Sequence, residues 1–228
     1  MKITYLGHSG FAVEFEDRML VFDYYEGELP QAGEKRKCYV FSSHSHKDHF
    51  QEKIFEWEDQ GYEVTYILSD DIRPREKGKN ILPVGPRRTY DVDDMQVKTL
   101  RSTDKGVAFF VYVKGKRIYH GGDLNWWHWE EESAAYNEMM KRKYQYEISR
   151  IGDTPIDVAF VPLDPRQEKQ YDWGMDYFMK HTDTRCVFPM HMWGDYSVCG
   201  RLKTSEGASA YADRFQSIEA PGQVFEIL

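Results

Sequence analysis

The chain has 228 residues, which is enough for one large domain with a substantial core but rather short for two independent domains. We therefore predict a single domain over residues 1–228. Hydrophobic residues make up 41% and aromatic residues 15% of the chain, which argues against a disordered protein. The formal net charge of -8 disfavours nucleic acid as a partner, because a polyanion is repelled unless a local basic patch overrides the balance.

Alternating apolar residues at the start of the chain predict strands over residues 3–6, 11–15 and 19–22, the last running into Asp23. The same plan returns in the middle of the chain. There we expect strands over residues 97–100, 107–113 and 117–120, the last running into Asp123. The repetition predicts two related β-rich halves that pack face to face.

Helical spacing appears between and after these strands. Phe50, Ile54 and Trp57 predict a helix that stops at Gly61. A longer helix is expected over residues 129–148, with three glutamates, Glu130, Glu131 and Glu132, in its first turn, where they suit the helix dipole.

Two more helices and three more strands are expected in the second half. The helices are predicted over residues 168–180 and 205–216, and the strands over residues 158–161, 186–188 and 224–227. Residues 70–88 are expected to form a long connection within the domain. Sheets with helices outside them follow from this order of elements, which makes the fold class α/β (α+β).

The segment with the clearest chemistry follows a short apolar strand expected over residues 38–41. It carries His44, His46, Asp48 and His49 just before a predicted helix. In an extended segment, residues i and i+2 project to the same side, so His44 and His46 can converge on one ion. The turn into the helix lets Asp48 and His49 face the same cavity. Imidazole and carboxylate ligands together suit zinc, iron or manganese.

Two other predicted strands end in ligand residues. Residues 117–120 lead into Gly121-Gly122-Asp123, where the glycines let the backbone approach closely, so Asp123 is a candidate bridging ligand. The strand that begins at residue 186 ends at His191, a candidate terminal ligand. Strands that end in this way are expected to converge at one edge of a sandwich and to form a metal site.

Other polar residues near these strand ends leave two interpretations open. Asp164 either caps a turn or borders the active site, and His128 either packs at a helix start or faces the substrate. Asp23 and His120 are expected to support ligands by hydrogen bonding rather than to bind metal. His181 is expected to serve the dipole at the end of a helix.

These motifs resemble those of the metallo-β-lactamase superfamily, over nearly the whole chain. The string His44-x-His46-x-Asp48-His49 looks like the signature of that family, Asp123 matches its bridging aspartate and His191 its last histidine. The turn at residues 7–10, residues 116–123 and residues 189–191 are particularly similar to the ascorbate-phosphate-lactonase-like branch of uncharacterised hydrolases. The resemblance implies a four-layer αββα sandwich, two mixed β-sheets flanked by helices, with a dinuclear site.

The resemblance also implies a ligand set. It places His44 and His46 at one metal, Asp48, His49 and His191 at the other, and Asp123 between them. One turn departs from the family, which usually has a third histidine for the first metal where this chain has Ser102-Thr103-Asp104. Either Asp104 substitutes as an oxygen ligand, which would favour manganese or iron, or the first metal is weak or absent.

We therefore expect a metal-dependent hydrolase that uses one or two divalent ions, with zinc as the first choice and manganese or iron as alternatives. A metal-bound hydroxide would attack a small-molecule ester, lactone or phosphate-ester substrate. Asp48 would orient or deprotonate the water, and His8 would contact the substrate or donate a proton, unless His8 is a turn histidine satisfied by the backbone. A nuclease or phosphodiesterase of the same fold and a degenerate, non-catalytic metal-binding scaffold are the alternatives.

The expected partner is a small-molecule substrate. Six basic residues between Arg73 and Arg88 would either attract an anionic substrate or belong to a solvated loop, because nearby acidic residues dilute their charge. No apolar run approaches the ~20 residues needed to span a bilayer. The three cysteines are widely spaced and form no Cys-x-x-Cys pair. We expect neither nucleic acid nor membrane as a partner, and a soluble protein in a reduced, cytoplasmic setting.

Overall fold

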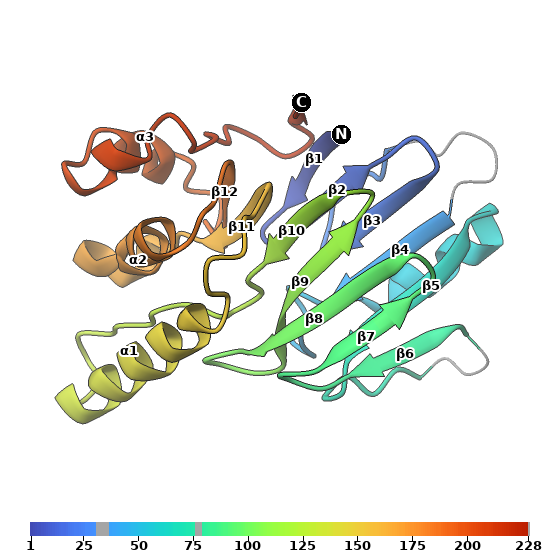
Figure 1. Cartoon of the computed structure of the whole chain (residues 1–228), viewed down its shortest axis with the longest axis horizontal. Helices are drawn as coiled ribbons and strands as arrows, with labels where there is room; N and C mark the ends of the chain where they lie inside the picture. Colours follow the sequence, from blue (N-terminus) through green and yellow to red (C-terminus); the bar gives the residue numbers. More distant parts are fainter. Residues whose placement is uncertain (31–36, 76–78, 228) are drawn as a thin grey trace. The chain divides into compact units, whose positions relative to one another are not determined.

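The computed structural model of the chain (Figure 1) describes residues 1–30, 37–75 and 79–227. It separates into two compact units. Unit 1 comprises Met1–Gly85 with Glu219–Leu228, and unit 2 comprises Pro86–Ile218. The prediction of one domain over the whole chain stays a prediction, whereas each predicted half has a compact unit of its own.

Unit 1 is built on a seven-stranded mixed sheet, coloured blue to turquoise in Figure 1 apart from the red strand β13. The order of its strands is β13-β1-β2-β3-β4-β5-β6. Neighbours from β13 to β3 are antiparallel, and those from β3 to β6 are parallel. The strands are β1 (Lys2–Gly7), β2 (Gly10–Glu14), β3 (Arg18–Phe22), β4 (Lys37–Ser42), β5 (Glu63–Ser69), β6 (Ile81–Val84) and β13 (Val224–Glu226).

Unit 2 is built on a six-stranded mixed sheet with the order β12-β11-β10-β9-β8-β7. Neighbours from β7 to β10 are antiparallel, and those from β10 to β12 are parallel. Both sheets therefore run an antiparallel meander into parallel strands, which confirms the predicted repetition. The strands are β7 (Thr89–Val92), β8 (Met95–Arg101), β9 (Val107–Val113), β10 (Lys116–His120), β11 (Val158–Pro162) and β12 (Val187–Met190).

Helices accompany both sheets. In unit 1, η1 (Glu52–Gln60) contacts β5 and buries Ile54 and Trp57. In unit 2, α1 (Ala134–Ser149) packs on α2 (Trp173–His181), which contacts β11. The predicted fold class, α/β with two mixed β-sheets flanked by helices, is confirmed.

Three predicted helix boundaries are corrected. The helix expected from Phe50 is a 3-10 helix, η1, and it ends as predicted at Gly61, whose left-handed φ of 91° suits glycine. Helix α1 begins at Ala134 rather than 129, because Ser133 caps it by accepting a hydrogen bond from Tyr136 N at 3.2 Å. The three glutamates at 130–132 therefore precede the helix and do not lie in its first turn. The helix expected over 168–180 is two pieces, η2 (Pro165–Gln170) and α2.

The helix predicted over 205–216 is wrong, because most of that segment is not helical. The helix of this region is α3 (Ser197–Lys203), and only the short η3 (Gly207–Ala210) lies within the predicted range. Ala208, Tyr211 and Phe215 are buried at helix-like intervals, which explains the error: a packed irregular segment can bury residues at that spacing too.

The predicted connection over residues 70–88 is also wrong in part, since β6 lies within it and pairs with β5. Isolated short strands are hard to detect because their pairing partner, not their own pattern, stabilises them. Residues 76–78 of that connection lie outside the described residues.

The three cysteines are free and buried. Burial raises the pKa of the Cys38 thiol to about 12 and that of Cys186 to about 11. In the part of the chain that the structure describes, no helix is both long enough and apolar enough to cross a bilayer.

Helix α2 passes so close to the loop before α1 that only glycine fits at position 174. A Cβ on Gly174 would lie 1.8 Å from Asn125 Oδ1, and Asn125 is held by a hydrogen bond from its Nδ2 to Gln167 Oε1 at 2.9 Å. Gly174→Ala is expected to lower the free energy of unfolding by about 1–3 kcal/mol, as overpacking does. Gly200→Ala, in α3 with nothing within 4 Å, is the control and is expected to stabilise by about 0.5–1 kcal/mol. Urea denaturation measures both, and an unchanged midpoint for Gly174→Ala would contradict the close packing.

Candidate metal centre

The segment between β4 and η1 folds back on itself in unit 1. His46 O accepts hydrogen bonds from His49 N at 3.0 Å and Phe50 N at 2.9 Å, which closes a tight turn. The turn brings the ring centroids of His44 and His49 to 4.2 Å, and His44 Nε2 lies 2.9 Å from His46 Nδ1. The imidazoles that the sequence placed in one string are thus gathered at one point.

A buried carboxylate holds His49 in place. Asp23 Oδ2 lies 2.7 Å from His49 Nδ1 and accepts a hydrogen bond from Ser43 Oγ at 2.6 Å, while Asp23 Oδ1 accepts one from Ser43 N at 2.7 Å. Asp23 and His49 are fully buried. With Nδ1 directed at a carboxylate, the lone pair of His49 is on Nε2, which is the arrangement that supports histidine ligands of metals. This is the contact expected of Asp23 as a supporting residue.

His8 joins the same group from the turn between β1 and β2. Its Nε2 lies 3.2 Å from Asp48 Oδ2, and ligand atoms of His8, Asp48 and His49 lie within 4.8 Å of one another. Partial burial alone would raise the pKa of Asp48, but the hydrogen bond from His8 and the charge of His49 together hold this pKa below its ordinary value. Asp48 is therefore an ionised carboxylate at neutral pH. We call His8, His44, His46, Asp48 and His49 the histidine cluster.

A second group lies in unit 2, at the ends of β10 and β12. His191 Nε2 is 3.4 Å from Asp123 Oδ1, and His191 Nδ1 is 2.9 Å from Asp164 Oδ2. Asp164 also accepts a hydrogen bond from Arg166 N at 2.9 Å, so it both caps the turn into η2 and orients His191. Its pKa would be raised by burial, but hydrogen bonds from His191 and Arg166 lower it. The turn-capping interpretation of Asp164 is therefore confirmed, whereas its place at the border of an active site stays a prediction.

Asp104 lies in the turn between β8 and β9, beside Asp123. Their carboxylate oxygens are within 4.8 Å of each other. The turn is tied to the Asp123 loop through Thr103, whose hydroxyl donates to Asp123 O at 3.1 Å and accepts from Asn125 N at 3.0 Å. The aspartate that stands where the family usually has histidine is therefore close to the predicted bridging residue. We call Asp104, Asp123 and His191 the aspartate group.

Several candidate residues adopt a left-handed backbone, which side chains rarely do. The φ angle is 49° at His8, 41° at Asp23 and 65° at His191. Each such residue costs on the order of 1–3 kcal/mol, and these conformations concentrate at functional sites. One of these three residues belongs to the histidine cluster, one supports it and one belongs to the aspartate group. Their shared left-handed backbone therefore favours a functional role for both groups.

Two residues that hold these contacts together were not among the predicted site residues. Ser43 precedes the motif and hydrogen-bonds Asp23, and Arg166 forms an ion pair with Asp164 at 2.6 Å. The spacing Asp164-Pro165-Arg166 was a detectable signal of a capped turn, whereas nothing in the local sequence links Ser43 to Asp23, 20 residues away.

The other histidines have defined contacts. His120 is buried, and its Nδ1 accepts from Gly122 N at 3.2 Å, which shapes the loop that carries Asp123. His181 ends α2 with Nδ1 2.8 Å from Tyr177 O. His128 packs against Trp173, with ring centroids 4.8 Å apart.

The donor sets of both groups fit a divalent metal ion. The histidine cluster offers four imidazoles and an ionised carboxylate, and the aspartate group offers two carboxylates and an imidazole. Nitrogen and oxygen donors of this kind suit zinc, manganese and iron. In both groups a histidine is oriented through Nδ1 by an aspartate, which fixes the tautomer that leaves Nε2 for a ligand bond.

Two mixed sheets with histidine and carboxylate donors at their strand ends are the arrangement expected of a metal-binding protein. The chain belongs to the metallo-β-lactamase superfamily, since its residues 2–138 match the family described as the Beta-lactamase superfamily domain. The predicted membership is confirmed, and with it the predicted enzyme class, a metal-dependent hydrolase of this superfamily.

Similar proteins support this membership. A protein named UPF0173 metal-dependent hydrolase from Korarchaeum cryptofilum is 32% identical over 134 residues, which cover 54% of this chain and 60% of the relative. Another of that name, from Symbiobacterium thermophilum, is 25% identical over the full length of both chains.

Solved structures share the fold. Igni18 from Ignicoccus hospitalis, described as a novel metallo hydrolase, has a TM-score of 0.65 at 20% identity and covers 99% of this chain and 98% of its own. The metallo-β-lactamase fold protein YhfI from Bacillus subtilis has a TM-score of 0.66 at 11% identity, with 98% of each chain covered.

Proposed function

We propose that the chain hydrolyses a small-molecule ester, lactone or phosphate ester with the help of one or two divalent metal ions. The observation that carries this is the histidine cluster, in which His8, Asp48 and His49 point ligand atoms at one another within 4.8 Å. A solvated surface cluster would not have His49 fully buried against the carboxylate of Asp23. A buried charge is retained where a partner or a function requires it.

The ligand assignment is part of the proposal. His44 and His46 would hold one ion, Asp48, His49 and His191 would hold the other, and Asp123 would be a ligand of both. Support for it comes from the match to the family signature and from the orientation of His49 by Asp23 and of His191 by Asp164.

Asp104 would take the place of the third imidazole at the first ion. Asp104 lies within 4.8 Å of Asp123. This position favours a ligand role for Asp104 over the alternative that the first ion is weakly bound or absent. Zinc is the proposed metal. The added oxygen ligand raises the relative affinity of the site for manganese and iron, so these ions are alternatives.

The chemistry divides between the ion and the side chains. A bound divalent ion supplies Lewis acidity, which lowers the pKa of water and polarises a carbonyl or phosphoryl oxygen. Asp48, ionised at neutral pH, orients the attacking water and accepts its proton. His8, 3.2 Å from Asp48, contacts the substrate and returns a proton to the leaving group.

The proposed partner is a small molecule rather than nucleic acid, because the net charge of -8 opposes a polyanion. We also propose a reducing, cytoplasmic setting, in which three free and buried thiols persist.

The experiment combines metal analysis with a substrate panel. The purified protein is reconstituted separately with zinc, manganese and ferrous iron, and its metal content and turnover of lactones, phosphodiesters and phosphomonoesters are measured. We expect at least one bound ion per chain and turnover in one substrate class. A protein that binds no metal would refute the site, and one that binds metal without any turnover would be a scaffold.

Asp104 is tested in the same experiment. Asp104→Ala is expected to lower the occupancy of the first ion, and Asp104→His, which restores the usual imidazole, to raise zinc affinity above that of the wild type by about tenfold or more. Lys105→Ala, an exposed neighbour, is the control. Equal metal content in all four proteins would remove Asp104 from the ligand set.

A further inference from the structure

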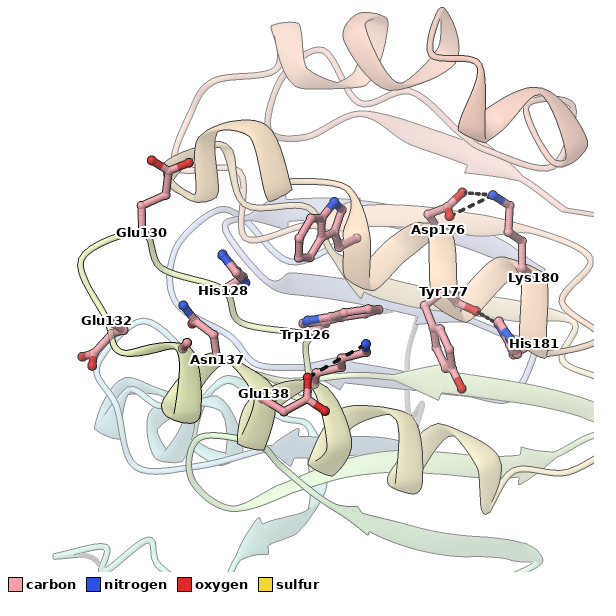
Figure 2. Close-up of a pocket in the computed structure, with 13 residues that line it drawn as sticks. Trp126, His128, Glu130, Glu132, Asn137, Glu138, Asp176, Tyr177, Lys180 and His181 are labelled. Atoms are coloured by element: carbon pink, nitrogen blue, oxygen red, sulfur yellow. Dashed lines mark hydrogen bonds and ion pairs between the residues drawn. The ribbon is translucent and has the colours of Figure 1, made fainter.

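Unit 2 contains a cavity that includes none of the proposed metal ligands. It has a volume of about 800 Å³ and lies between the loop that precedes α1, helix α1 and helix α2 (Figure 2). A volume of this size accommodates a small organic molecule.

Aromatic rings form its walls. The ring centroid of Trp126 lies 5.3 Å from that of Trp173 and 6.0 Å from that of Tyr177, with interplanar angles of 60° and 79°. Figure 2 shows Trp126 between His128 on one side and Tyr177 on the other. Flat ligands such as nucleobases stack best in a slot between parallel rings. The steep angles between these rings do not form a parallel slot of that kind.

The charge of the lining is negative. Four carboxylates, those of Glu130, Glu132, Glu138 and Asp176, face the cavity, against the ammonium groups of two lysines. Lys180 is neutralised by Asp176 at 2.9 Å, and Lys141 lies 4.0 Å from Glu138. Within the described ranges of the chain, neither Glu130 nor Glu132 takes part in an ion pair. The carboxylates of Glu130 and Glu132 are therefore available to pair with a bound cation.

One wall of the cavity already carries a cation. The ammonium of Lys141 lies 5.5 Å from the ring centroid of Trp126, within the range of a cation–π contact. The Trp126 ring therefore already takes part in a contact with an ammonium group at this wall.

The walls are held rigidly. The side-chain amide of Asn137 bonds both backbone groups of Trp129, at 3.1 Å to N and 2.7 Å to O. Gln167 Nε2 donates to Trp126 O at 3.1 Å, and Tyr144 donates to Gly174 O at 2.7 Å. A binding site that is ordered before its ligand arrives loses less entropy on binding.

We propose that this cavity binds a small organic cation through an alkylated ammonium head, which sits against Trp126 and Trp173 with Glu130 and Glu132 as counter-charges. Hydrolysis plays no part in the inference, so it does not rest on the proposed function. Alkyl groups on the nitrogen remove most of its hydration, so the aromatic faces replace little water and the carboxylates supply the charge preference.

Tetramethylammonium chloride is the probe, and tert-butanol, of similar shape but neutral, is the matched control compound. Binding is followed through the indole N–H signals of the tryptophans in nitrogen-15 NMR spectra, at constant ionic strength. We expect saturable shifts of the Trp126 and Trp173 signals with tetramethylammonium and none with tert-butanol.

Variants locate the site. Trp173→Ala is expected to weaken binding by about fivefold or more, as loss of a cation–π partner does, while Tyr146→Ala, an exposed aromatic residue of α1 outside the cavity, leaves it unchanged. The double variant Glu130→Gln with Glu132→Gln is expected to weaken binding by about threefold at low salt. The shifts of the Trp126 signal report binding in every variant that retains the wild-type spectrum elsewhere.

Three results would overturn the proposal. These are shifts that do not saturate, equal shifts with tert-butanol, and tetramethylammonium affinity that Trp173→Ala and the glutamine double variant leave unchanged. Each can occur whether or not the protein hydrolyses any substrate, so failure here is distinguishable from failure of the proposed function.

Discussion

Replacing His49 by alanine is expected to remove the metal ion that His49 would bind and to lower kcat/KM by about 10³-fold or more. This decrease is at least as large as the one seen when a single preorganised electrostatic group is removed from an active site. His49 is fully buried, its Nδ1 contacts Asp23, and its Nε2 is directed toward the group that includes Asp48. Elemental analysis and steady-state kinetics on a responsive substrate measure the two effects.

A matched control is available two residues away. Lys47 belongs to the same string but is exposed, so Lys47→Ala is expected to keep both metal and activity. His49→Ala also leaves the carboxylate of Asp23 without the imidazole, so its folding is checked by circular dichroism and thermal unfolding. A folded His49→Ala protein with wild-type metal content would refute the site assignment, and the same outcome for Asp123→Ala would refute it independently.

Replacing Asp23 by alanine is expected to lower the free energy of unfolding by about 3–5 kcal/mol, because each buried hydrogen-bonding group left without its acceptor costs about 1–3 kcal/mol. Asp23 is fully buried and accepts hydrogen bonds from Ser43 N and Oγ and contacts His49 Nδ1. The variant leaves these groups without their acceptor. Metal affinity is expected to fall by about 10- to 100-fold, as for other residues that orient a histidine ligand.

Urea denaturation and metal titration measure these effects separately. Glu16→Ala removes an exposed carboxylate from the turn before β3 and is expected to change stability by no more than about 0.5 kcal/mol. Asp23→Asn keeps an acceptor but reduces the charge, so it is expected to recover part of the stability and less of the metal affinity. If Asp23→Ala unfolds at the wild-type urea concentration and binds metal as tightly, Asp23 does not support His49.

Some of the candidate site followed from local patterns. Alternation of apolar residues predicted the meanders of both sheets, because side chains on a strand point to opposite faces in turn. The string from His44 to His49 predicted ligand residues at the end of β4, because a strand end followed by a turn presents closely spaced side chains together. Boundaries that depend on packing, such as the start of α1 at Ala134 and the absence of a long helix over 205–216, were missed.

The network that orients the ligands depends on neighbouring strands rather than on neighbouring residues. Asp23 follows β3 and Ser43 follows β4, and these parallel strands lie side by side, which brings the two residues together. Asp164 and His191 follow β11 and β12, which are parallel neighbours in the other sheet. Both sheets therefore place an aspartate beside a histidine at the carboxyl ends of adjacent parallel strands.

By itself, the sequence determined the candidate ligands, their place at strand ends and the family, because spacing and residue chemistry are local properties. Only the tertiary structure decided which aspartate orients which histidine, that Asp104 lies beside Asp123, and that Trp126 and Trp173 wall a cavity with carboxylates. These contacts join residues distant in the chain. Strand order and helix packing bring such residues together, and neither can be deduced from the spacing of residues within one segment.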